Sequence, residues 1–424
     1  MRPRTAELGL LVMASLITVS AYGLTSLGRA ASLPANIVPF LGIVLGLLLG
    51  GHLVVRQLAP LADGLLLPLA ALLNGLGYVV IARLDPDLAA SQSAWTFIGL
   101  CGFAVTLIAV KDVRRLESYR YSLALLGVVL LLLPLLPGLG VNINGARIWL
   151  RVGPFSIQPG EFAKVVLAAF LAGYLVDKRE LLMLSNRRVG PLHLPDFKYF
   201  GPLLLAWGVA LVVIVAERDL GSSLLFFALF VVMLYLSTGR TAYVLTGLTM
   251  FGGGAYLAFR NFSHVQRRVD IWLHPFDDPK NAGFQIVEAS FALADGGITG
   301  TGLGLGTPGK IPYAPTDMIF AAIGEETGLL GASAVLITFI LFAATGFRVA
   351  SQSTDDFEKL LAAGLTALLS FQAFVIVGGI LRVLPLTGVT LPFVSYGGSS
   401  LIANYVILAL LVRISDRSRR AVAS

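Results

Sequence analysis

The sequence predicts an all-helical protein that crosses a membrane many times. Of its 424 residues, 56% are hydrophobic and only 13% are charged, whereas a soluble protein carries about 25% charged residues. The mean hydropathy is +0.84, and apolar runs of membrane-spanning length recur along the whole chain. These three observations exclude a cytosolic enzyme, a disordered protein and a nucleic-acid-binding protein.

Membrane-spanning helices are predicted wherever about 20 consecutive residues are apolar, because a helix of that length crosses the hydrocarbon core of a bilayer. About twelve such runs lie near 8–27, 34–54, 61–82, 93–110, 121–140, 161–177, 199–216, 222–237, 241–260, 319–345, 360–381 and 398–415. The first run is not expected to be a cleaved signal peptide, since no convincing cleavage site follows it and a second run begins soon after.

The positions of the basic residues predict the orientation of these spans. Lysine and arginine collect in cytoplasmic loops, and most of the 31 basic residues fall inside if the N-terminus is cytoplasmic and the spans alternate. The net charge of +7 is therefore interpreted as a topology signal. Both termini are expected in the cytoplasm.

Three polar segments then lie on the outer side of the membrane. The longest, 261–316, carries aromatic and aliphatic residues at amphipathic spacings, so we expect it to fold against the membrane surface. The segment 141–160 is too polar to span and favours an interfacial helix or a hairpin. The segment 382–397 contains two prolines, which is typical of a re-entrant or broken helix.

An acidic pair, Asp277 and Asp278, precedes Pro279 inside the longest outer segment. Proline disfavours helical geometry at the residue before it, so the Asp278 side chain is expected to stand off any helix. Two adjacent carboxylates near a surface of low dielectric are expected to raise each other's proton affinity, which suits a general base. The alternative is an ordinary solvated turn, and the residues alone favour the turn.

Basic side chains near the same side suggest an anion site. Lys164 lies one turn into a predicted span, where a charge is costly and marks a functional candidate. Glu161 lies three positions earlier on the same helical face, so one reading is a mutual ion pair that stabilises the helix start. The other is that Lys164, with Arg147 and Arg268, holds a diphosphate at the outer leaflet. The residues favour neither reading.

Further acidic residues lie at predicted helix ends. Asp219 is next to Arg218, where a local salt bridge is the ordinary interpretation. Glu325 and Glu326 lie near the outer end of the run 319–345, and two carboxylates at membrane depth require partners.

Several motifs resemble sites of other chemistry without completing them. The segment 304–310 has the spacing of a phosphate-binding loop, but Ile311 replaces the residue that would hold magnesium and no strand precedes it. The glycine series Gly296, Gly297, Gly300, Gly302, Gly304 and Gly306 instead indicates tight turns and close backbone approach. The single cysteine, Cys101, excludes disulfide frameworks and cysteine-based metal sites, and the four histidines show no metal-ligand spacing.

The same segments resemble a known family. The run PLTGVTLPFVSYGGSSL (385–401) is similar to the C-terminal signature of the SEDS proteins, the RodA/FtsW/SpoVE family of cell-wall polymerases. Five further stretches match in order: GARIWLRVGPFSIQPGEFAK (145–164), RDLGSS (218–223), RRVDIWLHPFDDPKNAGFQIV (267–287), GGITGTGLGLG (296–306) and TDMIFAAIGEETGLLGA (316–332).

The resemblance, which covers roughly 74–415, implies a division of the chain. A core membrane domain is expected over 61–415, with the large outer loop at about 261–316. Two additional N-terminal helices over 1–60 resemble the actinobacterial RodA-like branch, and 416–424 is expected to be a basic cytoplasmic tail.

The resemblance also implies an activity, peptidoglycan glycosyltransferase. Lipid II is polymerised into glycan strands at the outer face of the plasma membrane, with release of polyprenyl diphosphate, and a role in cell elongation is favoured over division. The family's essential acid corresponds to Asp278, which would act as the general base. Other matched positions are expected to contact the substrate or its diphosphate: Arg147, Glu161, Lys164, Asp219, Arg268, Gln285, Asp317, Glu325 and Ser395.

Partners and alternatives follow from the same resemblance. A class B penicillin-binding protein, a transpeptidase, is the implied protein partner. A divalent cation, Mg²⁺ or Mn²⁺, is expected to assist at the diphosphate with ligands from the lipid, because no all-protein cage is visible in the sequence. Two other functions stay open: a flippase that moves lipid II across the membrane, and a non-catalytic scaffold for the penicillin-binding protein.

Overall fold

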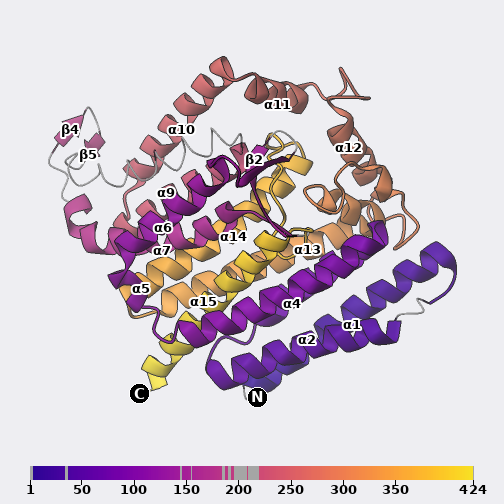
Figure 1. Cartoon of the computed structure of the whole chain (residues 1–424), viewed down its shortest axis with the longest axis horizontal. Coiled ribbons are helices and arrows are strands. Elements are labelled where there is room, and N and C mark those ends of the chain that lie inside the picture. Colours follow the sequence, from indigo (N-terminus) through magenta and orange to yellow (C-terminus); the bar gives the residue numbers. More distant parts are fainter. Residues whose placement is uncertain are drawn as a thin grey trace. The chain divides into compact units, whose positions relative to one another are not determined.

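The computed structural model describes residues 3–33, 37–143, 146–153, 155–183, 187–189, 192–194, 208 and 219–423. The described chain is mostly helical (Figure 1). Its α-helices are α1 (Pro3–Ala30), α2 (Ile37–Leu58), α3 (Leu66–Leu84), α4 (Pro86–Ala109), α5 (Arg115–Ser118), α6 (Arg120–Leu132), α7 (Pro159–Met183), α9 (Leu220–Thr238), α10 (Thr241–Asn261), α11 (Ser263–Leu273), α12 (Phe284–Gly296), α13 (Ile319–Gln352), α14 (Asp356–Ile380) and α15 (Gly398–Ala423).

Ten of the described helices are long and apolar enough to cross a membrane. They correspond to ten of the predicted runs. The run 121–140 forms a shorter apolar helix, Arg120–Leu135, and the run 199–216 lies outside the described residues except for residue 208. The prediction of a polytopic helical membrane protein is confirmed.

Two small antiparallel sheets interrupt the helices. One is formed by β1 (Gly140–Ile143), β2 (Ala146–Val152) and β3 (Phe155–Ile157), and the other by β4 (Arg187–Val189) and β5 (Leu192–Leu194). In the first sheet, Leu150 is paired with Gly140 on one side and Ile157 on the other. Of the two structures expected for 141–160, the hairpin is therefore correct.

The chain divides into two compact units. Unit 1 contains residues 1–110, 263–346 and 372–424, and unit 2 contains residues 111–262 and 347–371. The helices α13 and α14 contribute residues to both units.

In unit 1, the C-terminal helix is anchored along its last turns. The Arg413 guanidinium donates to the carbonyl oxygens of Leu58 (2.7 Å) and Val110 (3.0 Å). Further along α15, the Asp416 carboxylate accepts a hydrogen bond from the Leu61 backbone at 2.7 Å. These bonds satisfy the carbonyl groups at the ends of α2 and α4 and an amide of the loop that follows α2. The segment 416–423, expected to be a tail, thus continues α15.

Also in unit 1, the glycine-rich segment 297–306 docks against a break in α13. Gly328 has φ +64° and ψ −167°, so the helical hydrogen bonds stop there. Backbone bonds from the glycine-rich segment replace them: Leu329 N to Gly297 O (2.9 Å), Leu330 N to Ile298 O (3.1 Å), Thr301 N to Glu325 O (2.9 Å) and Gly302 N to Glu326 O (3.1 Å). The broken helix therefore keeps its backbone groups paired, as a membrane interior requires.

The helix α1 packs closely on the same segment. A Cβ atom added to Gly304 would lie 2.2 Å from the Thr25 carbonyl oxygen, and one added to Gly28 would lie 2.2 Å from the Leu303 carbonyl oxygen. Only glycine permits this backbone approach. Gly304, the first glycine of the segment that resembles a phosphate-binding loop, thus serves the close packing that the sequence indicated.

Candidate active site

The candidate base, Asp278, lies in the turn between α11 and α12 of unit 1, with its side chain exposed. Its carboxylate accepts hydrogen bonds from Asn281 Nδ2 (2.8 Å) and from the Ala282 backbone (3.2 Å). The Asn281 bond first, and then the backbone bonds, lower the pKa of Asp278 below its ordinary value of 3.8. The expectation that the acidic pair raises its proton affinity is therefore wrong, because exposure and local donors favour the charged form.

The helix before Asp278 is held against the segment 381–397. Arg268, on α11, donates to the carbonyl oxygens of Leu386 (3.2 Å) and Thr387 (3.0 Å). One turn later, Trp272 Nε1 donates to the Arg382 carbonyl at 2.9 Å, and the Arg382 guanidinium donates back to the Trp272 carbonyl at 3.4 Å. These bonds fix the position of α11 and the start of the turn that carries Asp278.

The segment 382–397 itself is non-helical, lying between the end of α14 and the start of α15. Arg382 and Phe393 adopt left-handed backbone angles, with φ +59° and +62°. Such angles are uncommon for side chains larger than glycine and require support from the surroundings. For Arg382, the reciprocal bonds with Trp272 supply that support.

A second carboxyl group, Asp317, lies just before α13. It accepts hydrogen bonds from Thr316 Oγ1 (3.1 Å) and Gln285 Nε2 (3.4 Å). Burial raises the pKa of Asp317, and the hydrogen bonds and the nearby charge of Arg268 oppose this rise. Gln285, Asp317 and Arg268 are thus brought together in unit 1.

Ser395 belongs to the same neighbourhood. Its hydroxyl donates to the Thr316 carbonyl and accepts from the Leu391 backbone at 2.8 Å. The side chain is buried. Ser395 therefore ties the segment 382–397 to the residue that precedes Asp317.

The buried carboxylates of α13 support the glycine-rich segment. Glu325 accepts hydrogen bonds from the Thr307 backbone (2.5 Å) and the Thr307 hydroxyl (3.4 Å). Glu326 forms an ion pair with Arg83 of α3 at 3.2 Å. Both carboxylates therefore have the partners that they require at this depth. Glu325 bonds Thr307 directly, and Glu326 pairs with Arg83, which donates to the Gly306 carbonyl.

In unit 2, Glu161 and Lys164 form the mutual ion pair that their spacing suggested. The nitrogen–oxygen distance is 2.9 Å, and the side chains are only 3% and 2% exposed. Arg147 lies on β2 and is partly buried. Asp219 caps α9 by accepting from the Ser222 backbone (3.0 Å) and the Ser222 hydroxyl (2.6 Å). Its predicted neighbour Arg218 lies outside the described residues.

Among the described residues, no group of three or more His, Cys, Asp or Glu side chains is arranged to hold a metal ion. The side chains do not fit a protein-built divalent cation site there, since such sites gather several carboxylate or carbonyl oxygens.

Three residues that position the site were not predicted from the sequence. Trp272 and Arg382 hold α11, and Arg83 holds Glu326. Trp272 carried a weak signal as an aromatic residue in an amphipathic segment. Neither arginine had a local signal, because the partners are 110 and 243 positions away along the chain.

Comparison with known proteins adds an independent finding. The sequence model of the FtsW, RodA and SpoVE family of cell cycle proteins matches residues 66–420. A peptidoglycan glycosyltransferase RodA of Mycobacterium tuberculosis is 45% identical over 98% of this chain and 91% of the relative. The RodA of Mycobacterium leprae is 43% identical over 99% and 92%, and a probable peptidoglycan glycosyltransferase FtsW of Geobacter metallireducens is 34% identical over 76% and 83%.

Solved structures are similar to this chain as well. A chain from a peptidoglycan synthase complex that coordinates polymerization and crosslinking is 29% identical, with a TM-score of 0.69 over 84% of this chain and 98% of that chain. The rod shape determining protein RodA of Thermus thermophilus is 27% identical, with a TM-score of 0.58 over 84% and 97%. A variant of that protein with one aspartate replaced by alanine has a TM-score of 0.60.

Proposed function

Because this chain belongs to the FtsW, RodA and SpoVE family and is a peptidoglycan glycosyltransferase, we propose that it polymerises lipid II at the outer face of the plasma membrane with Asp278 as the base. The observation that carries this proposal is the exposed carboxylate of Asp278, kept ionised by Asn281 and mounted beside the anchored helix α11. An ionised carboxylate can accept a proton, as a general base must.

The proposed reaction forms one glycosidic bond and breaks one bond between a sugar and its diphosphate. Asp278 takes the proton of the acceptor sugar hydroxyl, and the hydroxyl oxygen attacks the anomeric carbon of the donor sugar. The bond between that carbon and the diphosphate oxygen breaks, and the polyprenyl diphosphate leaves with the electron pair. Substrate that covers Asp278 would remove water from the carboxylate and make it a stronger base than it is when exposed.

The leaving diphosphate needs positive charge. Of the three candidate cations, Arg268 bonds two carbonyl oxygens and Lys164 is paired with Glu161. Arg147 is engaged by no hydrogen bond or ion pair from the described part of the chain, so we assign the direct diphosphate contact to Arg147 and a supporting field to Lys164 and Arg268. A divalent cation would arrive with the diphosphate and take its ligands largely from phosphate oxygens.

The test uses Asp278→Asn and a matched control, Asp277→Asn, each purified as the full chain and given lipid II. Loss of a general base lowers the rate by about 10²–10⁴-fold, so Asp278→Asn is expected to make almost no glycan while Asp277→Asn stays near wild type. A thermal unfolding midpoint equal to that of wild type shows that the variant is folded. Unchanged polymerisation by folded Asp278→Asn would refute the base assignment.

The same preparations separate the alternative functions. A flippase would move labelled lipid II across vesicle membranes and would respond to substitutions on the cytoplasmic side, while Asp278→Asn would leave transport intact. A scaffold would make no glycan as wild type, even with its transpeptidase present. The glycosyltransferase names of relatives that match 98–99% of this chain favour the polymerase.

We further propose a class B penicillin-binding protein as the partner and cell elongation as the process. The similarity to a chain from a peptidoglycan synthase complex supports the partner, and the identity to RodA proteins, 45% against 34% to an FtsW, supports elongation. Depletion of the protein is expected to give rounded cells. Filaments with blocked septa would indicate division instead. Crosslinks from the partner's single helix are expected on the late spans and not solely on α1 and α2.

A further inference from the structure

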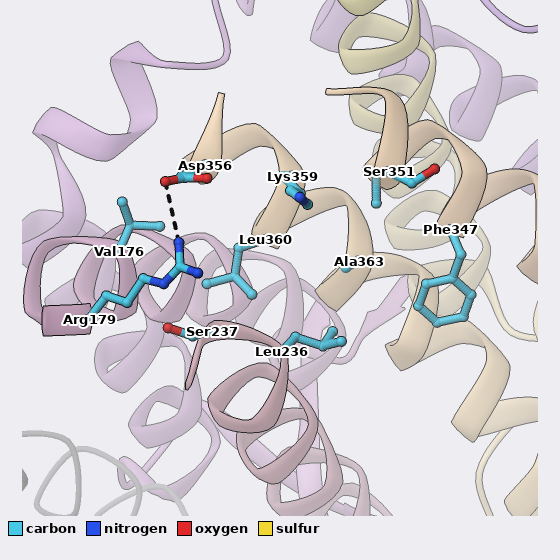
Figure 2. A pocket seen from close by; sticks show the side chains of 11 residues that line it. Val176, Arg179, Leu236, Ser237, Phe347, Ser351, Asp356, Lys359, Leu360 and Ala363 are labelled. Carbon is cyan, nitrogen blue, oxygen red and sulfur yellow. Dashed lines mark ion pairs between the residues drawn. The ribbon is translucent and has the colours of Figure 1, made fainter. Parts of the chain in front are cut away.

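A pocket of about 240 Å³ lies within unit 2, and none of its lining residues belongs to the candidate active site. It lies where α7, α9, α13 and α14 end or begin, and its lining residues all belong to unit 2 (Figure 2). Arg179 comes from α7, Leu236 from the end of α9 and Phe347 from α13, and Asp356, Lys359 and Leu360 come from the start of α14.

The lining is divided into an apolar part and a charged part. Leu236, Phe347 and Leu360 supply large apolar side chains. The first two are 42% and 40% exposed although they are large hydrophobics. Arg179 and Lys359 supply positive charge beside them. A site with this division suits a ligand that is itself part apolar and part charged.

The depth of the pocket in the membrane follows from the helix ends. Arg179 is near the end of the candidate span Pro159–Leu182, Leu236 near the end of Gly221–Thr238, and Lys359 near the start of Asp356–Ile380. The ends of membrane-spanning helices lie at the level of the lipid headgroups. The pocket is therefore at headgroup depth, and in the proposed orientation it faces the cytoplasmic leaflet.

The charges leave the pocket positive. Arg179 and Asp356 form an ion pair of 3.5 Å whose side chains are 47% and 63% exposed, so the pair is weak and its arginine can turn to another anion at little cost. Lys359 is exposed, and no ion pair with a described residue holds it. Two cations against one carboxylate favour an anion, and basic pockets between membrane helices on the cytoplasmic side bind anionic lipid headgroups.

We propose that this pocket binds the phosphate-bearing headgroup of an anionic phospholipid, with its acyl chains running along the exposed Leu236 and Phe347. The volume agrees with this ligand, because 240 Å³ is below the roughly 300–1,000 Å³ of pockets that enclose a whole drug-sized molecule. The headgroup would be enclosed and the chains would stay in the bilayer. This inference is independent of the proposed base and cations of the polymerase.

The test measures binding of phosphatidylglycerol and phosphatidylcholine to the full chain by native mass spectrometry from detergent micelles. The variant Arg179→Gln/Lys359→Gln is expected to bind phosphatidylglycerol about 30-fold more weakly, since each basic residue near an anionic membrane contributes about 1 kcal/mol and 1.4 kcal/mol is tenfold. Phosphatidylcholine binding is expected to be unchanged. The matched control Lys111→Gln/Arg115→Gln removes two exposed charges outside the pocket and should bind like wild type.

Further variants and competition by inorganic phosphate distinguish a bound lipid from a bound free anion. Phe347→Ala should weaken phosphatidylglycerol binding but leave competition by inorganic phosphate unaltered, because only the lipid contacts the apolar side. Equal affinity of wild type for the two lipids, or an unaffected double variant, would overturn the proposal. Competition by inorganic phosphate as strong as that by the lipid would identify a free anion as the ligand and would also overturn it. Lys359→Arg keeps the charge and is expected to bind phosphatidylglycerol like wild type; binding as weak as that of the double variant would show that the charge is not what holds the lipid and would overturn the proposal.

Discussion

Asp278 and Asp317 belong to the same unit, and their carboxyl groups are held in opposite ways. Asn281 lowers the pKa of the exposed Asp278, whereas burial raises the pKa of Asp317. Asp277 and Asp278 were expected to raise each other's proton affinity, but the repulsion between two exposed charges is screened by water, whereas the direct hydrogen bond from Asn281 is not. Pro279 and the family motif made Asp278 the candidate base, and this role stays a proposal. The direction of its pKa shift was predicted wrongly, because hydrogen-bond donors from the next turn are not visible as a sequence pattern.

Replacing Asn281 by alanine is expected to move the acid limb of the pH–rate profile upward. The pKa of Asp278 is depressed, so its carboxylate is charged above that pKa and is lost as the pH falls through it. Without the Asn281 amide, the pKa rises toward 3.8, and activity is lost at a higher pH than in wild type. The measurement is kcat/KM against pH, with Asn261→Ala as a control, since the amide of that exposed asparagine bonds only the Leu257 carbonyl. An identical acid limb in Asn281→Ala would contradict the role of this bond.

The buried pair Glu161 and Lys164 allows its structural and functional readings to be separated. Glu161→Gln alone removes the carboxylate that pairs with the buried Lys164 ammonium at 2.9 Å, and we expect a loss of up to about 3–5 kcal/mol of stability. The double variant Glu161→Leu/Lys164→Met replaces the pair by apolar side chains of similar size and is expected to recover most of that loss. Unfolding midpoints measure both effects. Since we propose that Lys164 contributes charge at the diphosphate, the stable double variant should polymerise at least about 10-fold more slowly; full activity would leave only the structural reading.

At the scale of elements, the hydropathy pattern predicted which segments are helical but not that α13 is interrupted. The run 319–345 predicted one helix, and α13 does extend over Ile319–Gln352, but Gly328 breaks it. A glycine inside an apolar run has no local mark that distinguishes a break from ordinary packing. The break becomes visible only with its partner, the segment 297–302, which supplies the missing backbone bonds.

The packing of α1 on the glycine-rich segment predicts an unequal response of two glycines in one loop. Gly304→Ala places a Cβ atom 2.2 Å from the Thr25 carbonyl oxygen at a backbone φ of +81°, whereas Gly309→Ala meets nothing within 4 Å. Overpacking of this kind costs about 1–3 kcal/mol. Gly304→Ala is therefore expected to lower the unfolding midpoint and to speed hydrogen exchange in α1, with Gly309→Ala unchanged. Equal behaviour of the two variants would mean that α1 does not pack here.

At the scale of the whole molecule, a simple physical requirement made the architecture predictable. A helix needs about 20 apolar residues to cross a bilayer, so the hydropathy pattern located the ten described spans. The contacts that complete the fold and the site instead join residues that are far apart in the sequence. Trp272 bonds the Arg382 carbonyl 110 positions away, and Asp416 bonds the Leu61 backbone 355 positions away. No repeat or spacing in one sequence encodes such pairs, and they could not be predicted.

The orientation of the whole chain can be tested with single cysteines. Cys101 is exposed on α4, so the background is Cys101→Ala. Lys310→Cys in the large loop and Ser118→Cys after α4 are both at exposed positions. A membrane-impermeant maleimide added to intact cells is expected to label the first and to label the second only after the cells are opened. The reverse pattern would place Asp278 in the cytoplasm and would refute an outer-face polymerase.

The docking of 297–302 onto the interrupted turn of α13 has a consequence for how relatives of this chain can diverge. Each stretch supplies the backbone partners that the other lacks, so an insertion in one shifts the register of both. We therefore expect paired substitutions at these two stretches across related sequences, and almost no change of length in either. Although 24 positions separate Thr301 from Glu325, the two stretches are expected to coevolve.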